Sequence, residues 1–294
     1  MLLLTGATGL IGAPLLRRLV AARIPVRCLV RDATRLGPER VRVQIALGDL
    51  TDPPSFRNAL RGVKTVVHLA GSIRDQPGGS IEELNGIATW RMVQAAERAG
   101  VQHFIHLSAL GAGAHNRTRY LRAKALAERA VSESVLRHTI VAPSLAYAPG
   151  DRWATLLLRL SIAPVVPLPG DGKACSQPIW AQDVADCLLA IIQRPLAGDG
   201  AIRHELAGPE TLTAVQVAHT ILQAAGRRRA VLPVPVPVAS RVLRVAETLA
   251  KSRAPVTWDE AELLQVSLTS THGTAHAQAL GVDPQRMAVV LGPV

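Results

Sequence analysis

Tyr120 and Lys124 stand four residues apart in the stretch 117–134, whose pattern predicts a helix. Residues i and i+4 share one helix face, so both side chains should point the same way. A nearby ammonium group stabilises a phenolate and lowers the pKa of the phenol. The pair is therefore typical of proton transfer to or from a substrate oxygen. The plainer alternative is an exposed tyrosine and lysine on an arginine-rich helix.

Ser108 lies at the end of the predicted strand His103–Ser108, shortly before that helix. Its hydroxyl would polarise a substrate carbonyl by hydrogen bonding, or else it would cap the end of the strand. Both interpretations stay open. Together with Tyr120 and Lys124, Ser108 completes the set of candidate catalytic residues.

A glycine-rich turn follows the first predicted strand and precedes an amphipathic helix. The three glycines would allow a tight turn, close approach of the backbone to a diphosphate, and close packing of the helix on the strand. Free N–H groups at the helix start would face the anion. The candidate binding residues of this turn are Gly6, Thr8, Gly9, Leu10, Ile11 and Gly12.

The second predicted strand ends at Val30-Arg31-Asp32, with Arg35 close behind. An acidic residue at this tip would bind the ribose of NAD, but Val30 takes that place. Arg31 and Arg35 could instead bind the 2′-phosphate of NADP, so NADP(H) is favoured over NAD(H). In the alternative, both arginines are solvated and Asp32 reaches the ribose.

The first half of the chain alternates short apolar strands with helical segments, which predicts a doubly wound α/β fold with a parallel sheet. We expect a dinucleotide-binding domain at 1–150 and a smaller, mostly helical part at 151–294, partly interleaved with the first. The expected strands are Leu2–Thr5, Val26–Val30, Val41–Leu47, Thr65–Ala70, His103–Ser108 and His138–Ala142. The expected helices between them are 10–23, 55–61, 81–99 and 117–134.

The second half is less regular. We expect Asp183 to cap one helix and Thr211 or Thr213 to cap another, with further helices near 239–251, 258–266 and 284–291. The prolines in Val231–Val238 exclude a central strand and predict an extended, packed connection.

The formal net charge is +11, and the excess lies almost wholly in residues 1–150. An anionic partner is one explanation, but aromatic residues are only 3% of the chain, so we expect no nucleic acid. No apolar run is long enough for a transmembrane span. His272 and His276 lack a third ligand, so we expect no metal site. We expect a cytoplasmic protein, or one peripheral to the inner face of a membrane.

An ordered set of motifs resembles the extended and atypical short-chain dehydrogenase/reductase superfamily, which includes NAD-dependent epimerases and dehydratases. Within it, the chain resembles the branch of the nucleotide-binding accessory subunit of respiratory complex I. The motifs are the turn Thr5–Gly12, Gly48–Leu50, Val67–Gly71, Asn85 with Ala95–Val101, His106–Ala109, the Tyr-x-x-x-Lys pair, Pro167–Gly170, Gln182–Ala185 and Leu206–Glu210.

The resemblance implies further site residues. It puts Asp49 with Leu50 near the adenine, Ala70 and Gly71 along the diphosphate, Pro143 and Ser144 beside the nicotinamide, and Lys124 on the nicotinamide ribose. The chain also departs from the pattern. Many extended members carry the third catalytic hydroxyl one residue later, where this chain has Ala109, and the interval from Ser108 to Tyr120 is short.

Two functions follow from this resemblance. The first is an NAD(P)-dependent oxidoreductase, or an epimerase or dehydratase, that acts on a carbonyl or hydroxyl group of an unidentified small molecule. The second is a non-catalytic NADP(H)-binding subunit or regulator associated with a larger, membrane-bound complex. The intact Tyr120–Lys124 pair favours the enzyme, since a purely structural site would not need the phenol.

Overall fold

The computed structural model describes residues 1–194, 202–241 and 256–292. A seven-stranded parallel sheet forms its centre, in the order β11-β6-β5-β4-β1-β2-β3. The order of strand addition reverses between β1 and β4, and ligands of such sheets bind in the crevice at this point. The strands are β1 (Leu2–Thr5), β2 (Val26–Val30), β3 (Gln44–Leu47), β4 (Thr65–His68), β5 (His103–Leu107), β6 (Arg137–Pro143) and β11 (Ile202–Leu206).

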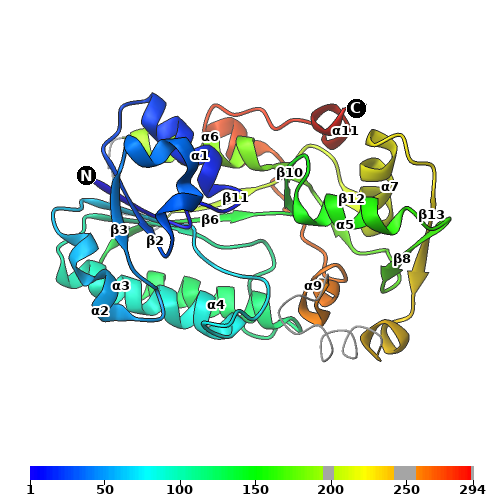
Figure 1. The fold of residues 1–294 in the computed structure, drawn as a ribbon, viewed down its shortest axis with the longest axis horizontal. Coiled ribbons are helices and arrows are strands. Elements are labelled where there is room, and N and C mark those ends of the chain that lie inside the picture. Colours follow the sequence, from blue (N-terminus) through cyan, green and yellow to red (C-terminus); the bar gives the residue numbers. More distant parts are fainter. Residues whose placement is uncertain (195–201, 242–255, 293–294) are drawn as a thin grey trace.

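Helices cover both faces of the sheet (Figure 1). α1 (Gly12–Ala21) and α6 (Ala181–Gln193) lie on one face, and α2 (Pro53–Phe56), α3 (Ala88–Arg98) and α4 (Arg119–Ser132) lie on the other. Alternate residues of β1 explain this arrangement: Leu4 packs with Leu15 and Leu188 in one apolar cluster, and Leu3 packs with Met92 in another. The expected doubly wound α/β fold is therefore confirmed.

Several elements differ at their ends from the expected ranges. Val41 belongs to the 3₁₀ segment η1 (Ala33–Val41), so β3 is shorter than expected. The expected helix 55–61 divides into α2 and the 3₁₀ turn η2 (Arg57–Leu60). The expected helix 81–99 begins with a π-helical turn, η3 (Glu83–Ile87), which continues into α3.

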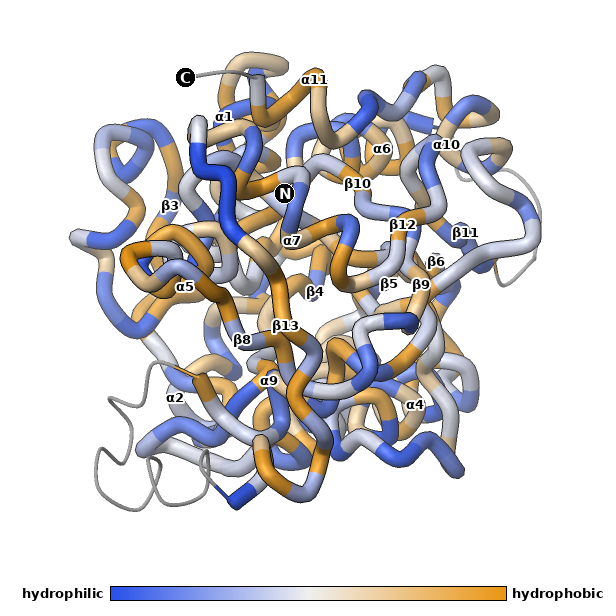
Figure 2. The backbone as a smooth tube through the Cα atoms, turned by 90° about the vertical axis from the view of Figure 1, so that its right-hand side faces the viewer, coloured by the Kyte–Doolittle hydropathy of each residue, from blue (hydrophilic) through white to orange (hydrophobic). Residues whose placement is uncertain are grey.

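The rest of the chain forms a smaller part with its own apolar cluster around Leu157, Val166 and Leu222. Figure 2 views the side of the molecule that carries α5, β8 and β13. Besides α6, the described helices after residue 150 are α5 (Arg152–Leu160), α7 (Ala214–Ala224), α9 (Trp258–Leu263), α10 (Ala275–Ala279) and α11 (Met287–Leu291). Three two-stranded sheets join them: β7 (Ala146–Tyr147) with β10 (Ile179–Trp180), β8 (Val165–Pro169) with β13 (Ala230–Val234), and β9 (Cys175–Ser176) with β12 (Leu212–Thr213).

Thr213 caps α7 in a reciprocal capping box with Gln216, as expected. The expectation for Asp183 is wrong: the cap position of α6 is Trp180, and the Asp183 carboxylate accepts a hydrogen bond from the backbone nitrogen of Gln285, 3.0 Å away. Proline-rich β13 pairs only with β8 among the described strands, which agrees with its exclusion from a central sheet. Residues 236–241 are helical, and the rest of the expected helix 239–251, from residue 242 on, lies outside the described residues.

Residues after position 150 also belong to the layers around the seven-stranded sheet, because α6 packs on α1 and β11 extends that sheet. The division of the chain at residue 150 stays a prediction. Among the described residues, no helix combines the length and the apolar character that a membrane span requires.

Candidate active site

The turn between β1 and α1 leaves no room for side chains at two of its glycines. Gly6 has a φ of +72°, and a Cβ atom there would lie 2.7 Å from the backbone nitrogen of Ala70. A Cβ atom on Gly12 would lie 2.0 Å from the carbonyl oxygen of Gly6. No described side chain caps α1 at Ile11, and its first turn contains no acidic residue. Ala13 N already donates to the Gly9 carbonyl oxygen and Pro14 has no N–H, so the helix start offers an anion the N–H groups before Ala13 and the positive end of the helix dipole.

A cavity of about 350 Å³ opens beside this turn, at the carboxyl ends of β1, β2 and β4. The structure brings most of the expected cofactor-binding residues together here. Those that line the cavity are Gly6, Thr8, Gly9, Arg31, Arg35, Asp49, Leu50, Ala70 and Gly71.

The other expected cofactor-binding residues do not line this cavity. Ile11 is buried in the core, Leu10 is 43% exposed, and Gly12 packs on Gly6. Pro143 ends β6, and the Ser144 hydroxyl donates to the carbonyl oxygen of Leu268, 2.5 Å away. Roles for these residues in cofactor binding stay predictions.

The tip of β2 presents arginine side chains to the cavity. The Asp32 carboxylate is engaged locally, since it accepts hydrogen bonds from the backbone nitrogen and the hydroxyl of Thr34, at 2.9 and 2.6 Å. These bonds to Thr34 lower the pKa of Asp32. Arg31 is 57% exposed, with its guanidinium 3.9 Å from the Asp49 carboxylate. One oxygen of Asp32, Oδ1, is therefore engaged in its own turn, and Asp32, Arg31 and Arg35 all line the cavity.

The loop after β4 is held by Asn85, a fully buried amide on the π-helical turn. Its Nδ2 donates to the carbonyl oxygens of Ser72 (2.7 Å) and Ile81 (2.8 Å), and its Oδ1 accepts from the Ser72 backbone nitrogen at 3.2 Å. A Cβ atom on Gly71 would lie 2.5 Å from that Oδ1. The loop can thus lie against Asn85 only because residue 71 is a glycine.

A buried chain of hydrogen bonds continues beneath this loop. His68 Nδ1 is 2.9 Å from the Thr5 hydroxyl, and its Nε2 is 3.1 Å from the Thr89 hydroxyl. Thr89 donates to the carbonyl oxygen of Asn85. Burial, and then the charge of Lys124, lower the pKa of His68 to about 3, so this ring is neutral at physiological pH. The chain of bonds links the end of β1 to the π-helical turn.

Tyr120 and Lys124 lie in the first half of α4, as predicted, on one face of the helix. Lys124 Nζ donates to the carbonyl oxygen of Leu107 at 2.7 Å and stands 5.8 Å from the centre of the Tyr120 ring. Burial lowers the pKa of Lys124 to about 8. Burial also raises the pKa of Tyr120 to about 12, the opposite of the expected direction, because desolvation of the phenolate dominates in this environment.

Ser108 follows β5 directly, next to the carbonyl that Lys124 binds. It is 2% exposed, and its hydroxyl has no hydrogen-bond partner among the described residues. A strand-end cap would need such a partner. The hydroxyl is thus an unsatisfied buried group, which is rare in folded proteins, and a catalytic role for Ser108 stays a prediction.

Sequence reasoning gave Asn85 only as part of a motif and missed its positioning role. The signal that could have indicated it is an amide on the apolar face of the helical pattern, in line with Ile81, Ala88 and Met92. The cavity also includes residues outside the expected set: Ala7, Leu29, Val30, Asp32, Gly48, Leu69, Ser72, Gln76 and Leu84.

Comparison with known proteins identifies the kind of site. A family model described as NAD(P)H-binding matches residues 6–195. NAD(P)H azoreductase of Xenophilus azovorans is 31% identical over 77% of this chain and 74% of its own length. Sterol demethylase protein B of Methylococcus capsulatus is 36% identical over 53% of this chain and 55% of its own length. The chain thus spans little more than half of the length of that relative.

Mitochondrial NADH dehydrogenase [ubiquinone] 1 alpha subcomplex subunit 9 of Arabidopsis thaliana is 28% identical over 72% of this chain and 55% of its own length. Among solved structures, a nucleoside-diphosphate-sugar epimerase from Staphylococcus aureus matches with a TM-score of 0.77 and 23% identity, over 99% of both chains. The NADPH-dependent quinone oxidoreductase of Escherichia coli, complexed with NADPH, has a TM-score of 0.75 and 17% identity, over 99% of this chain and 98% of its own. The resemblance drawn from the sequence motifs is confirmed for the NAD(P)H-binding family, and complex I subunits are among the relatives.

Proposed function

Because this chain belongs to the NAD(P)H-binding family of reductase- and epimerase-type proteins, we propose that it is an enzyme that binds NADP(H) and acts on a carbonyl or hydroxyl group of a small molecule. The observation that carries this proposal is the buried ammonium of Lys124 next to the partly buried ring of Tyr120, near the unpaired hydroxyl of Ser108. A purely structural nucleotide site has no use for these three groups.

The cavity beside the glycine turn fits a dinucleotide. Side chains are excluded at Gly6 and Gly71, so the backbone of both turns can approach a diphosphate. The uncapped start of α1 supplies N–H donors and the positive end of a dipole. When bound, the nicotinamide group would donate or accept a hydride.

Tyr120 is the proposed acid and base. With its pKa raised to about 12, the phenol carries its proton at neutral pH and can donate it to a substrate oxygen as a carbonyl is reduced. Ser108 would donate a hydrogen bond to the same oxygen. Lys124, held by the Leu107 carbonyl, would place positive charge beside the phenol and stabilise the phenolate that is left. The protonated phenol favours reduction; an epimerase or dehydratase step is the alternative.

NADP(H) is proposed over NAD(H) on the arrangement at the β2 tip. Thr34 engages the Oδ1 atom of Asp32, which leaves only Oδ2 of this carboxylate for a ribose hydroxyl and disfavours a two-oxygen contact. Arg31 and Arg35 line the same wall and would pair with a 2′-phosphate through charge-assisted hydrogen bonds.

The test is Tyr120→Phe, with Tyr147→Phe as a matched control. Tyr147 is the other tyrosine of the chain; it is buried, and its hydroxyl has no partner among the described residues. NADPH oxidation is followed with a panel of aldehydes, ketones and quinones. We expect Tyr120→Phe to lower kcat about 10²- to 10⁴-fold with NADPH affinity retained, and Tyr147→Phe to leave both unchanged. Equal turnover by Tyr120→Phe and the original protein would remove Tyr120 from the mechanism.

The second candidate is a non-catalytic NADP(H)-binding subunit of a membrane-bound complex, which the similarity to the NADH dehydrogenase subunit supports. The exposed side chains of Ile162 and Val165, after α5, would then belong to a docking surface. Co-purification with a large membrane complex, with NADPH bound but never oxidised across the carbonyl panel, would favour this candidate. It would also place the protein at a membrane surface instead of free in the cytoplasm.

A further inference from the structure

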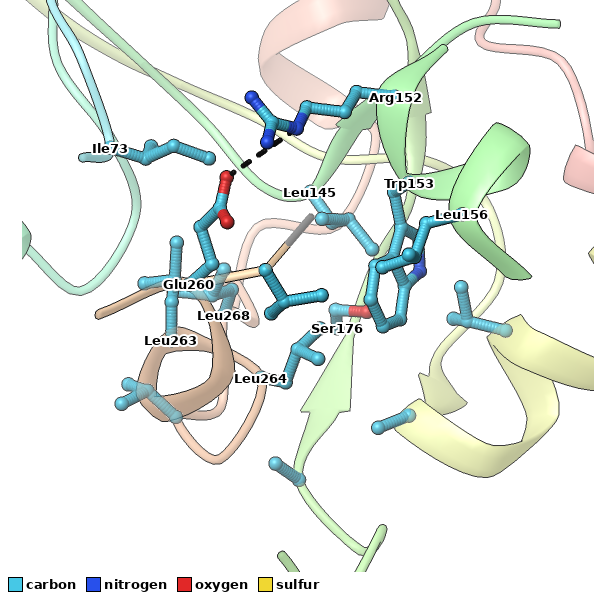
Figure 3. A pocket seen from close by; sticks show the side chains of 15 residues that line it. Ile73, Leu145, Arg152, Trp153, Leu156, Ser176, Glu260, Leu263, Leu264 and Leu268 are labelled. Carbon is cyan, nitrogen blue, oxygen red and sulfur yellow. Dashed lines mark ion pairs between the residues drawn. The ribbon is translucent and has the colours of Figure 1, made fainter. Parts of the chain in front are cut away.

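A second cavity, of about 150 Å³, lies between α5, α7 and α9 (Figure 3). Its described wall is almost entirely apolar: only Arg152, Ser176 and Glu260 bring polar side chains to it. Trp153 and Leu156 project from α5 into the cavity, and Leu263 and Leu264 approach from α9. Cavities of this composition bind ligands mainly by burying apolar surface.

The two charged groups of the wall are already paired. Glu260 binds Arg74 through two hydrogen bonds, one of 3.1 Å from Arg74 Nε. It also accepts from the backbone nitrogen of Thr257 at 2.9 Å, and Arg152 Nε stands 3.9 Å from its other oxygen. A charged ligand would have to break these contacts or enter without a counter-ion, and burying an unpaired charge is costly.

The same segment that lines this cavity also contacts the proposed catalytic helix. Leu263 and Val266 pack with Tyr120 against one apolar cluster, which includes Leu268. Arg119, the neighbour of Tyr120, pairs with Asp259 of α9 at 3.3 Å. The loop after β4 joins the two cavities, because Ser72 lines the first and Ile73 the second.

The Trp153 ring forms a flat apolar part of the wall (Figure 3). Its Nε1 atom is itself buried from the cavity, so the ring adds apolar surface to the wall.

We propose that this cavity binds the substrate, and that the substrate is an uncharged, mainly apolar carbonyl compound and not a sugar nucleotide. The inference rests on the proposed function for the reacting group. It adds the chemical class of the molecule that carries that group, and the residues that select it.

The test uses 2-acetylnaphthalene as the uncharged probe, with 6-acetyl-2-naphthoate and UDP-glucose as charged counterparts. Binding is measured by equilibrium dialysis in the presence of NADP⁺, so that no reduction occurs. Ala214→Trp fills the cavity, and Leu156→Glu places a charge in it. Ile162→Trp and Ile162→Glu are the matched controls, since Ile162 is 80% exposed and is not among the lining residues. Circular dichroism and NADPH binding establish that each variant folds.

We expect 2-acetylnaphthalene to bind saturably and at least tenfold more tightly than either charged compound. Ala214→Trp and Leu156→Glu should each weaken its binding at least tenfold, and the two controls should not change it. Equal or tighter binding of a charged compound would overturn the inference. The inference would also be overturned if 2-acetylnaphthalene did not bind. It would equally be overturned if the Ala214→Trp and Leu156→Glu proteins folded and still bound this compound with unchanged affinity.

Failure of this inference can be distinguished from failure of the proposed function. If the protein oxidises NADPH with a charged sugar nucleotide and Tyr120→Phe abolishes the reaction, the catalytic proposal stands and the assignment of an apolar substrate is wrong. If the probe binds as expected but no carbonyl compound is reduced, the apolar site stands and the catalytic proposal is wrong.

Discussion

Lys124 Nζ lies 2.7 Å from the carbonyl oxygen of Leu107, at the point where β5 ends and Ser108 begins. One bond thus ties α4 to the strand that carries the third candidate catalytic residue. It also holds a buried ammonium 5.8 Å from the Tyr120 ring. The distance between the positive charge and the phenol ring is therefore set by this one lysine side chain.

We expect turnover to depend on the charge of Lys124. Its pKa falls from 10.5 to about 8 because the group is buried, so the ammonium is present below pH 8 and is lost as the pH rises through that value. Lys124→Met should lower kcat roughly 100-fold at pH 7. Lys124→Arg should move the alkaline decline of turnover to higher pH, because arginine stays charged.

The measurement is a pH profile of kcat between pH 6 and 10. Lys173→Met, at a lysine outside the site, is the control. A profile of Lys124→Arg that matches the original one would mean that another group causes the alkaline decline.

We expect Arg31→Ala to weaken NADP⁺ binding about tenfold to hundredfold, since a hydrogen bond to a charged group contributes about 1.5–3 kcal/mol. NAD⁺, which lacks the 2′-phosphate, should bind with nearly unchanged affinity. Titration of both cofactors into the variant measures this. Arg42→Ala is the control, because Arg42 is exposed in the same half of the chain but does not line the cavity. Unchanged NADP⁺ affinity in Arg31→Ala would exclude Arg31 as the phosphate ligand.

We expect Gly12→Ala to destabilise the protein by about 1–3 kcal/mol and to abolish measurable NADPH binding. The added methyl group would lie 2.0 Å from the Gly6 carbonyl oxygen, so α1 must move away from the turn that meets the diphosphate. Urea unfolding and NADPH fluorescence measure the two effects. Gly113→Ala should be neutral, since its Cβ atom would come no closer than 3.8 Å to a neighbour. Normal NADPH binding by Gly12→Ala would show that the turn tolerates this shift.

The sheet carries three buried histidines with lowered pKa values, His68, His103 and His106, and they should limit stability in acid. His68 and His106 are fully buried, their rings stack with centroids 5.8 Å apart, and burial is the main cause of their lowered pKa values. The unfolded chain takes up protons near pH 6.5, but the folded chain holds the rings neutral to much lower pH. The unfolded state therefore binds more protons below pH 6.5, and stability falls as the pH falls.

Each of these three rings should lower the free energy of unfolding by about 1.4 kcal/mol per pH unit below 6.5. Neither ring nitrogen of His106 has a partner among the described residues, so His106→Leu should reduce this dependence by about a third and should not destabilise the protein at pH 7.5. Urea unfolding from pH 7.5 to 5 provides the measurement. His115→Leu, at an exposed position, is the control. An unaltered pH dependence in His106→Leu would mean that His106 does not contribute to acid unfolding.

The local pattern of the sequence determined the elements that hold the cofactor site. Apolar strands alternating with amphipathic helices predicted the parallel sheet, and the spacing of Gly6, Gly9 and Gly12 predicted the turn at its switch point. These features depend on neighbouring residues only, because helix periodicity, turn geometry and the close approach of backbones are set within a few residues. The Tyr120–Lys124 pair was readable for the same reason.

The tertiary structure decided what depends on distant contacts. Asn85 binds Ser72 from a π-helical turn, and no periodicity of the sequence indicates that turn. The pKa of Tyr120 rises instead of falling because of the burial that the packed site imposes, which a helical spacing does not contain. The apolar cavity combines Ile73, Trp153 and Leu263, three residues that only the packing of the C-terminal part against the sheet brings together. Desolvation and cavity shape are properties of the assembled fold, and so the chemical class of the substrate could be inferred only from the three-dimensional arrangement.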